Sequence, residues 1–312
     1  MRRTVAVALA VGALLAASAT HSTAGPAHAA SSCQATAAPS STVVKLTTPD
    51  GLSRQAILHL PRTHSQQPLP LLIALHGLGS SGAKYEQDTG YSTIADRDDF
   101  AVLYPSASGR EWLINSLSDR DVRFISLLLD RAAELACIDA RRVYATGVSN
   151  GGGMAARLGC ELSDRIAAIA PIAGGYRSLP DCTPTRPVSV LEIHGTADTT
   201  VPYDGAGAQH AGAVLPYLFE WVDRDDCRAQ PTKRQVAPHT VRYVWSGCRD
   251  GVSIQHLRIY GGKHGQPGAP GAEISSGGTH TISGSQQVWR FLAPLVLSPP
   301  DEPEDEGVQA GS

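Results

Sequence analysis

The chain lacks several features that would assign it to other classes of protein. It has no C-x-x-C pair, which argues against a cysteine-ligated zinc cluster. Its 26 basic and 29 acidic side chains give a net charge of −3, without the basic excess of nucleic-acid-binding proteins. Aromatic residues make up only 5%, so no sugar-stacking platform is visible. Beyond the N-terminal segment no long apolar run occurs, and we expect neither a membrane nor a nucleic acid as partner.

Residues 1–29 have the pattern of a cleavable signal peptide. Arg2 and Arg3 form a basic start, an apolar run covers residues 5–17, and Ala27-His28-Ala29 has the small-x-small pattern of a cleavage site. The apolar run is too short for a stable membrane span. The sequence therefore predicts a secreted, extracellular protein, which we expect to be a monomer.

The rest of the chain is long enough for one large α/β domain, which we place at residues 43–297. Residues 30–42 are small and polar, and we expect them to form a mobile N-terminal segment. Residues 298–312 are acidic and rich in proline, which predicts a disordered tail. Neither an internal repeat nor a second domain is visible in the sequence.

The six cysteines are an even number, which in a secreted chain favours disulfides. Six cysteines allow fifteen pairings. The local pairs Cys160–Cys182 and Cys227–Cys248 would each close a loop of about twenty residues, a constraint that the entropy model values at roughly 3 kcal/mol. Cys33–Cys137 then follows by elimination and is the least constrained of the three predictions.

Apolar runs and amphipathic segments alternate along the chain. Continuous apolar runs predict buried strands, and a spacing of three to four residues predicts helices. The predicted strands cover residues 55–60, 71–75, 100–104, 142–146, 166–172, 188–193, 241–245 and 253–260. The predicted helices cover residues 91–98, 121–135, 214–222 and 286–293, with a further helix starting near residue 152. This order predicts a mostly parallel central sheet with helices on both faces and a site at the carboxyl ends of the strands.

The pentapeptide Gly147-Val148-Ser149-Asn150-Gly151 matches G-x-S-x-G, the nucleophile elbow between a strand and a helix. The flanking segments fit this context, because a predicted strand precedes it and a predicted helix follows it. Glycines on both sides of the serine permit a tight turn and a close approach of strand and helix. Ser149 is therefore the candidate nucleophile of a hydrolase. The alternative is a glycine-rich loop without chemistry.

A serine hydroxyl needs a histidine base and an acid that orients the base. In this fold class the chain order is serine, acid, histidine, so both partners should follow residue 149. Asp198 lies just beyond the strand predicted at 188–193 and is the candidate acid, although it could be a loop aspartate that forms a turn. Its rivals lie further from the strand end or in a solvated helix end, and they are Asp204, Asp223, Asp225 and Asp226.

His264 is the candidate base, because it follows the strand predicted at 253–260 within a glycine-rich loop. The alternative assignment is a surface histidine. His280 is the second candidate, in an equally glycine-rich segment without a strand directly before it. His194 precedes Asp198, which is the wrong order for the base, and we expect it to pack beneath the site.

The oxyanion needs two preorganised backbone donors. Asn150, the residue after the nucleophile, would supply one amide. The loop His76-Gly77-Leu78-Gly79 after an early strand would supply the other, with the Leu78 amide preferred and Gly79 next. His76 is expected to be structural. Neither a metal nor a cofactor is required by this constellation.

Taken together, these blocks resemble the secreted α/β-hydrolase esterases of the polyhydroxybutyrate depolymerase and feruloyl esterase type, related to carbohydrate esterase family 1. The matching blocks follow the family's order across most of residues 45–295, and they are Leu75–Ser80, Arg142–Tyr144 with Gly147–Gly152, Ala167–Gly174, His194–Asp198 with Val201–Tyr203, and Gly261–Gly268.

The resemblance implies an α/β-hydrolase fold with Ser149 as nucleophile, Asp198 as acid and His264 as base. It is also consistent with a Cys227–Cys248 disulfide. One position departs from the family's usual Gly-Gly-His-x-Trp-Pro-Gly block, because Lys263 precedes the histidine and Gln266 stands in place of the tryptophan. In the family that tryptophan lies near the acyl or leaving-group site, so the departure concerns the choice of substrate.

The expected activity is that of a secreted serine carboxylesterase that cleaves feruloyl or acetyl esters of plant polysaccharides through an acyl-enzyme. One alternative is a depolymerase of poly(3-hydroxybutyrate) or its oligomers. Another is an acyltransferase on the same scaffold, which passes the acyl group to a sugar. A non-catalytic wall-binding protein with a decayed site is disfavoured by the intact serine, aspartate and histidine set.

Overall fold

The structure is a computed structural model, and it describes residues 40–62, 67–115, 117–176, 182–206, 212–269 and 282–297. All described residues lie within one compact unit of the chain. The predicted signal peptide, the predicted tail, Cys33 and His280 fall outside the described residues.

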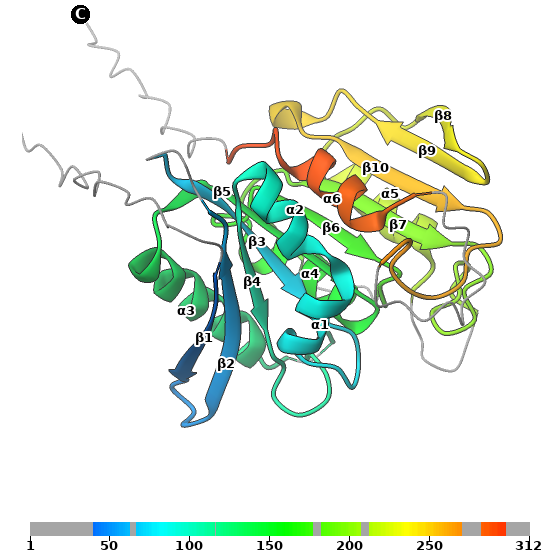
Figure 1. The fold of residues 1–312 in the computed structure, drawn as a ribbon. Helices are drawn as coiled ribbons and strands as arrows, with labels where there is room; N and C mark the ends of the chain where they lie inside the picture. Colours follow the sequence, from blue (N-terminus) through cyan, green and yellow to red (C-terminus); the bar gives the residue numbers. More distant parts are fainter. Residues whose placement is uncertain are drawn as a thin grey trace, which may run out of the picture. The chain divides into compact units, whose positions relative to one another are not determined.

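A ten-stranded sheet with the order β1-β2-β4-β3-β5-β6-β7-β10-β9-β8 forms the centre of this unit (Figure 1). From β4 to β10 in this order neighbouring strands are parallel, and an antiparallel pair of strands flanks them at each edge. The strands are β1 (Ser40–Thr47), β2 (Ser53–Leu60), β3 (Leu69–Leu75), β4 (Ala101–Pro105), β5 (Ile138–Val148), β6 (Ala168–Ile172), β7 (Ser189–Gly195), β8 (Thr232–Ala237), β9 (Thr240–Trp245) and β10 (Ile254–Ile259).

Helices cover both faces of the sheet, as Figure 1 shows. One apolar core lies between the sheet and α3, α4 and α5, and a second lies between the sheet and α1, α2 and α6. The helices are α1 (Gly82–Thr89), α2 (Tyr91–Asp98), α3 (Arg120–Leu135), α4 (Asn150–Glu161), α5 (Val214–Arg224) and α6 (Gly284–Leu292), with one 3₁₀ turn, η1 (Arg249–Gly251). The predicted architecture, a mostly parallel sheet between two layers of helices, is confirmed.

The sequence pattern explains the central layer. β3, β4, β6 and β7 are buried along their whole length, because helices cover both faces of these parallel strands. In α3 the apolar residues recur on one side, and that side is buried, including Val122, Ile125 and Leu128. Pro216 is compatible with α5 because it lies in the first turn of the helix, where a proline removes no intrahelical hydrogen bond.

Three elements differ from the sequence-based prediction. β1 begins at Ser40, so residues 40–42 belong to a strand paired with β2 and are not part of a mobile segment. β8, with its exposed polar side chains, gives no apolar run that a pattern could detect. α1 begins at Gly82, where the sequence pattern predicted no helix, and Ser81 caps it by accepting a hydrogen bond from Lys84 N at 3.3 Å.

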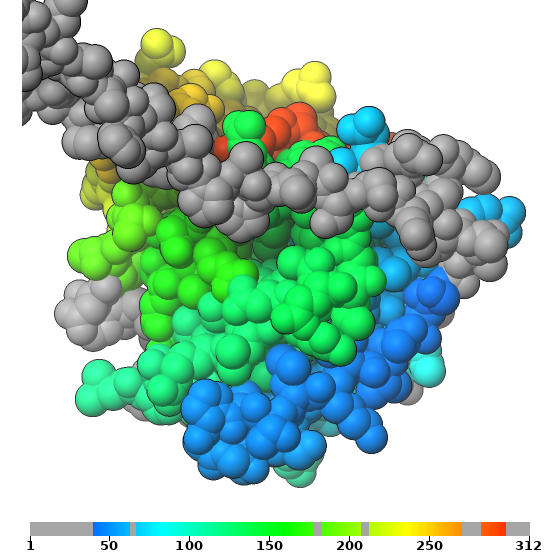
Figure 2. Space-filling view, turned by 90° about the vertical axis from the view of Figure 1, so that its left-hand side faces the viewer, coloured from blue at the N-terminus to red at the C-terminus, as the bar shows by residue number. Residues whose placement is uncertain are grey.

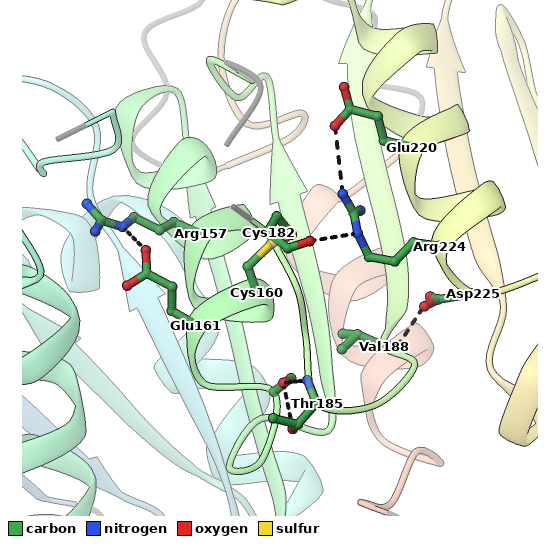
Figure 3. The surroundings of a disulfide bond; sticks show 10 residues. Arg157, Cys160, Glu161, Cys182, Thr185, Val188, Glu220, Arg224 and Asp225 are labelled. Carbon is green, nitrogen blue, oxygen red and sulfur yellow. Dashed lines mark hydrogen bonds and ion pairs between the residues drawn. A yellow bond between two sulfur atoms is a disulfide. The ribbon is translucent and has the colours of Figure 1, made fainter. Parts of the chain in front are cut away.

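Two of the predicted cysteine pairs form disulfides. Cys160–Cys182 joins the end of α4 to the segment between β6 and β7, and Arg224 Nε donates to the Cys182 carbonyl at 3.2 Å (Figure 3). Cys227–Cys248 closes the segment that contains β8 and β9. Cys137 is disulfide-bonded, and its predicted pairing with Cys33 stays a prediction.

The two edges of the sheet lie at opposite ends of the described unit. In the space-filling view of Figure 2 the blue residues of β1 and β2 lie at one end and the yellow residues of the β8–β9 region at the other, as the sheet order requires.

Within the described ranges we find no helix with the length and apolar character of a membrane span. The same residues contain no group of three or more histidine, cysteine, aspartate or glutamate side chains arranged to hold a metal ion.

Candidate active site

Ser149 occupies a strained turn between β5 and α4. Its backbone has φ 59° and ψ −121°, a conformation that costs a non-glycine residue about 1–3 kcal/mol and that tends to occur at functional sites. The flanking glycines allow the close approach that the turn needs. A methyl group on Gly147 would lie 2.4 Å from the Gly151 oxygen, and one on Gly151 would lie 2.2 Å from the Leu75 oxygen. The G-x-S-x-G segment therefore has the strand–turn–helix geometry of a nucleophile elbow.

Asp198 and His264 are joined by a hydrogen bond. His264 Nδ1 lies 2.8 Å from Asp198 Oδ2, although 66 residues separate the two in the chain. Asp198 follows β7 and His264 follows β10, and these strands are parallel neighbours. The Asp198 side chain is fully buried, whereas the His264 side chain is 23% exposed. A buried acid that orients a partly accessible imidazole is the arrangement that a general base requires.

Backbone amides hold the second oxygen of Asp198. Its Oδ1 accepts from Thr200 N at 2.9 Å and from Val201 N at 2.8 Å. Burial alone would raise the pKa of Asp198, but hydrogen bonds from the His194 and His264 rings lower it well below its ordinary value. The carboxylate is therefore ionised and oriented before any substrate binds.

Ser149 lies at the same edge of the sheet as this pair. β5 and β7 flank β6, so the strand ends that carry Ser149 and Asp198 are two strand spacings apart, roughly 10 Å. The Ser149 amide donates to Ile172 O at the end of β6, at 2.9 Å. Among the described residues no hydrogen bond joins Ser149 Oγ to the His264 ring. Contacts of this kind are often long in a substrate-free enzyme.

The loop after β3 lies against the nucleophile. A methyl group on Gly77 would be 3.5 Å from Ser149 Cβ. The His76 ring accepts from Ala107 N at Nε2, 3.0 Å away, so Nδ1 carries the proton and donates to Gly77 O at 2.8 Å. Burial lowers the pKa of His76, in keeping with a neutral ring that acts as a structural link.

The backbone amides of Leu78 and Asn150 differ in their hydrogen bonding from that of Gly79, the second choice in the loop after β3. Because Gly77 O is held by His76, the Leu78 N–H of the same trans peptide points the opposite way. The Gly79 amide donates to Arg110 O at 2.7 Å and is therefore engaged. Asn150 is the first residue of α4, where a backbone amide has no partner within the helix. This geometry favours Leu78 and Asn150 as the donors.

The side chain of Asn150 has a separate structural role. Its Oδ1 accepts from Trp112 N at 2.7 Å, and its Nδ2 donates to Trp112 O at 3.1 Å. Trp112 Nε1 in turn donates to His76 O at 3.0 Å. This link ties the elbow to the loop after β3, so the two proposed donors are positioned together. The sequence motif gave no indication of Trp112.

Gln266 lies two residues after His264, and its side chain is buried. Its Oε1 accepts from the Tyr85 hydroxyl at 2.8 Å, and its Nε2 donates to Ser285 Oγ at 2.6 Å. Gln266 therefore links the His264 loop to α1 and α6. The expectation that this position influences the choice of substrate finds no support in a side chain that hydrogen-bonds inside the protein.

His194 and Glu192 extend the site beneath Asp198, as expected for His194 and unexpectedly for Glu192. His194 Nε2 lies 3.2 Å from Asp198 Oδ2, and its Nδ1 lies 2.9 Å from Glu192 Oε1. The side chains of all three residues are fully buried. Their alternation along β7 places Glu192 and His194 on one face of the strand, a signal that the sequence contained but that an apolar strand prediction passes over.

The chain has the α/β-hydrolase fold. A solved structure with the same fold is the acetyl xylan esterase from Aspergillus awamori, with a TM-score of 0.60 over 81% of this chain and 99% of that one, at 16% sequence identity. Residues 54–176 match the family model described as Esterase PHB depolymerase. The resemblance drawn from the sequence blocks is thereby confirmed.

Curated relatives share this likeness. The chain is 29% identical to Feruloyl esterase B of Piromyces equi over 231 residues, which is 68% of this chain and 43% of the relative. It is 26% identical to the bifunctional acetylxylan esterase/xylanase XynS20E of Neocallimastix patriciarum over 236 residues, 74% of this chain and 32% of the relative. The chain therefore spans less than half the length of these two relatives.

Proposed function

We propose that the protein is a secreted serine carboxylesterase that cleaves feruloyl or acetyl esters of plant polysaccharides. The observation that carries the proposal is the Asp198–His264 hydrogen bond of 2.8 Å at the sheet edge where Ser149 occupies its strained turn. The relatives named as feruloyl and acetylxylan esterases support the ester class. Two disulfides support an oxidising, extracellular compartment.

The proposed reaction proceeds through an acyl-enzyme. Ser149 Oγ attacks the ester carbonyl while His264 Nε2 takes the hydroxyl proton, and Asp198 stabilises the imidazolium that forms. The amides of Leu78 and Asn150 bind the oxyanion of the tetrahedral intermediate. His264 returns the proton to the leaving alcohol. Water then repeats the sequence on the acyl-enzyme and releases the acid.

The test of the nucleophile is Ser149→Ala, assayed on p-nitrophenyl acetate and methyl ferulate. We expect kcat/KM to fall roughly 10⁴-fold or more, because the attacking oxygen is removed. Ser53→Ala, an exposed serine of β2, is the matched control and should retain full activity. Esterase activity that survives Ser149→Ala in a folded protein would disprove the assigned nucleophile.

The substrate class is tested with four esters on the wild-type protein: methyl ferulate, acetylated xylan, a short p-nitrophenyl ester and hydroxybutyrate oligomers. The proposal expects the first two to be cleaved. Cleavage of the oligomers alone would favour the depolymerase activity after which the matching family model is named. An added sugar acceptor that diverts the acyl group from water would identify an acyltransferase.

A further inference from the structure

His194 lies between two buried carboxylates. On one side its Nε2 is 3.2 Å from Asp198 Oδ2, and on the other its Nδ1 is 2.9 Å from Glu192 Oε1. The side chains of all three are fully buried, so the charges that they carry are shielded from bulk solvent. Behind the proposed acid–base pair there is thus a second histidine, bound to the same oxygen of Asp198 as His264.

The hydrogen-bond partners of His194 indicate where its protons lie. Nε2 lies 2.9 Å from Val201 O, which can only accept, so this nitrogen carries a proton. Nδ1 faces Glu192 Oε1, which also accepts from the Tyr176 hydroxyl at 2.9 Å. That hydroxyl accepts from Gly174 N at 3.3 Å, so its own proton points to Glu192. Both ring nitrogens therefore face oxygen acceptors, as the nitrogens of an imidazolium beside an ionised Glu192 would.

The electrostatics of the site agree with this proton count. Burial alone would lower the pKa of His194, but hydrogen bonds to Asp198 and Glu192 raise it to about 10. Burial would raise the pKa of Glu192, but the His256 and His194 rings lower it to about 2. Two buried anions and one buried cation thus alternate along a line that ends at His264.

The side chains that face Glu192, His194 and Asp198 from neighbouring elements do not change the sign of the charge that each of the three carries. Tyrosine rings approach these three residues from the segment after β6, from the loop after β7 and from α5. Imidazole and guanidinium groups approach them from β10 and from the loop that follows it. These side chains are Tyr176, Tyr203, Tyr217, His256, Arg258 and His264. His256 Nδ1 lies 2.6 Å from Glu192 Oε2, on the side away from Asp198. Among the described residues, only the His194 and His264 side chains contact the carboxylate of Asp198.

We propose that His194 is a permanently charged positioning residue, which shares Asp198 with His264 and so limits how strongly Asp198 favours protonation of that base. The role of His264 in this inference rests on the proposed function. Because Asp198 Oδ2 lies 3.2 Å from His194 Nε2 and 2.8 Å from His264 Nδ1, the fixed cation offsets part of the carboxylate's attraction for a proton on His264. His264 then stays unprotonated, and competent as a base, to a lower pH.

The first test is the pH dependence of kcat/KM on p-nitrophenyl acetate in His194→Gln. A neutral glutamine removes the fixed charge, so we expect the midpoint of the acidic limb to rise by roughly one pH unit. His256→Gln is the matched control, since it removes a buried imidazole from the same network without touching Asp198, and its midpoint should stay within about 0.3 units of the wild type. A folded His194→Gln protein with an unmoved acidic limb would overturn the inference.

A second variant guards against misfolding of the single substitution. Glu192→Gln combined with His194→Gln removes one anion and one cation, so the buried network keeps its balance of charge. His194 is nearer to His264 than Glu192 is, so the loss of its positive charge outweighs the loss of the Glu192 negative charge. We therefore again expect the midpoint of the acidic limb to rise. An unchanged or lowered midpoint in the folded double variant would contradict the proposed role.

The charge on His194 can also be observed without catalysis. Nitrogen-15 NMR of the wild type, with the His194 resonances assigned by their absence in His194→Gln, should show both ring nitrogens protonated up to pH 8.5. A neutral His194 ring at pH 8 would overturn the inference whatever the activity. If the ring is charged but no ester is hydrolysed, the proposed function fails while the charge assignment holds.

Discussion

Asp225 shows what burial does to a single carboxyl group. The side chain is fully buried near the end of α5, and its Oδ2 accepts from Val188 N at 3.3 Å, as drawn in Figure 3. Its Oδ1 has no hydrogen-bond partner. Burial raises the pKa of Asp225 to about 7. The folded protein therefore holds a proton that the unfolded chain releases near pH 4.

This sets the sign of a stability prediction. Between about pH 4 and pH 7 the native state binds more protons than the unfolded chain, so the free energy of unfolding falls as pH rises. Asp225→Asn should abolish this fall. At pH 8 its free energy of unfolding should exceed that of the wild type by about 2 kcal/mol, less than the full pKa shift would give because the native state relaxes around the ionised carboxylate. Urea unfolding from pH 4 to 8 measures it, with the exposed Asp223→Asn as control. Parallel pH profiles for wild type and variant would contradict the prediction.

Ser149 is the other residue whose environment matters by itself. A serine at φ 59° is held there by Gly147 and Gly151, which let β5 and α4 approach within contact distance. The motif predicted the turn, because glycine is required on both sides of it. It could not predict the Trp112–Asn150 link, since those residues are 38 positions apart in the chain.

At the scale of elements, the His264 loop depends on Gln266 for its position. The glutamine side chain bonds to Tyr85 on α1 and to Ser285 on α6, and both bonds are buried. The loop that bears the proposed base is thus attached to two helices on one face of the sheet. A small displacement of a catalytic group is enough to slow a reaction strongly.

Gln266→Ala should therefore lower kcat by roughly 10- to 100-fold with little change in KM. Steady-state kinetics on methyl ferulate separates the two parameters. Gln235→Ala, on the exposed strand β8, controls for loss of a glutamine elsewhere. The opposite result, a raised KM with kcat unchanged, would mean that position 266 contacts the substrate, as the tryptophan of related sequences suggested.

At the scale of the whole molecule, two disulfides constrain one side of the sheet. Cys160–Cys182 and Cys227–Cys248 close loops with sequence separations of 22 and 21 residues. The second loop contains β8 and β9, an antiparallel pair at the sheet edge whose β8 side chains are largely exposed. A strand pair with so little buried apolar surface of its own gains from a covalent closure.

Removal of Cys227–Cys248 by a double substitution to alanine should cost about 3 kcal/mol of unfolding free energy, according to the loop-entropy model. Denaturant unfolding without reductant measures the loss. When both proteins are measured under strong reductant, the wild type should approach the stability of the variant. This comparison separates the effect of the bridge from the packing of its side chains. Equal stability of the two proteins without reductant would show that the bridge does not constrain the unfolded chain as expected.

Much of the central architecture could be predicted because local sequence patterns indicate its strands and helices. The buried parallel strands are continuous apolar runs, and α2, expected at residues 91–98, forms at Tyr91–Asp98. The edge strands β1 and β8 were missed because half-exposed polar strands have no comparable signal. α1 was missed because its cap and its packing matter more than its composition.

The sequence by itself determined the strand–turn–helix at Ser149, the order of the candidate triad and two cysteine pairs, since each depends on neighbouring residues or on chain order. Only the tertiary structure decided that His194 and Glu192 lie behind Asp198, that Gln266 is buried, and that the Gly79 amide is engaged. Hydrogen bonds between segments such as 198 and 264 depend on which strands become neighbours in the sheet. That choice is made by packing of the whole core, and no local pattern encodes it.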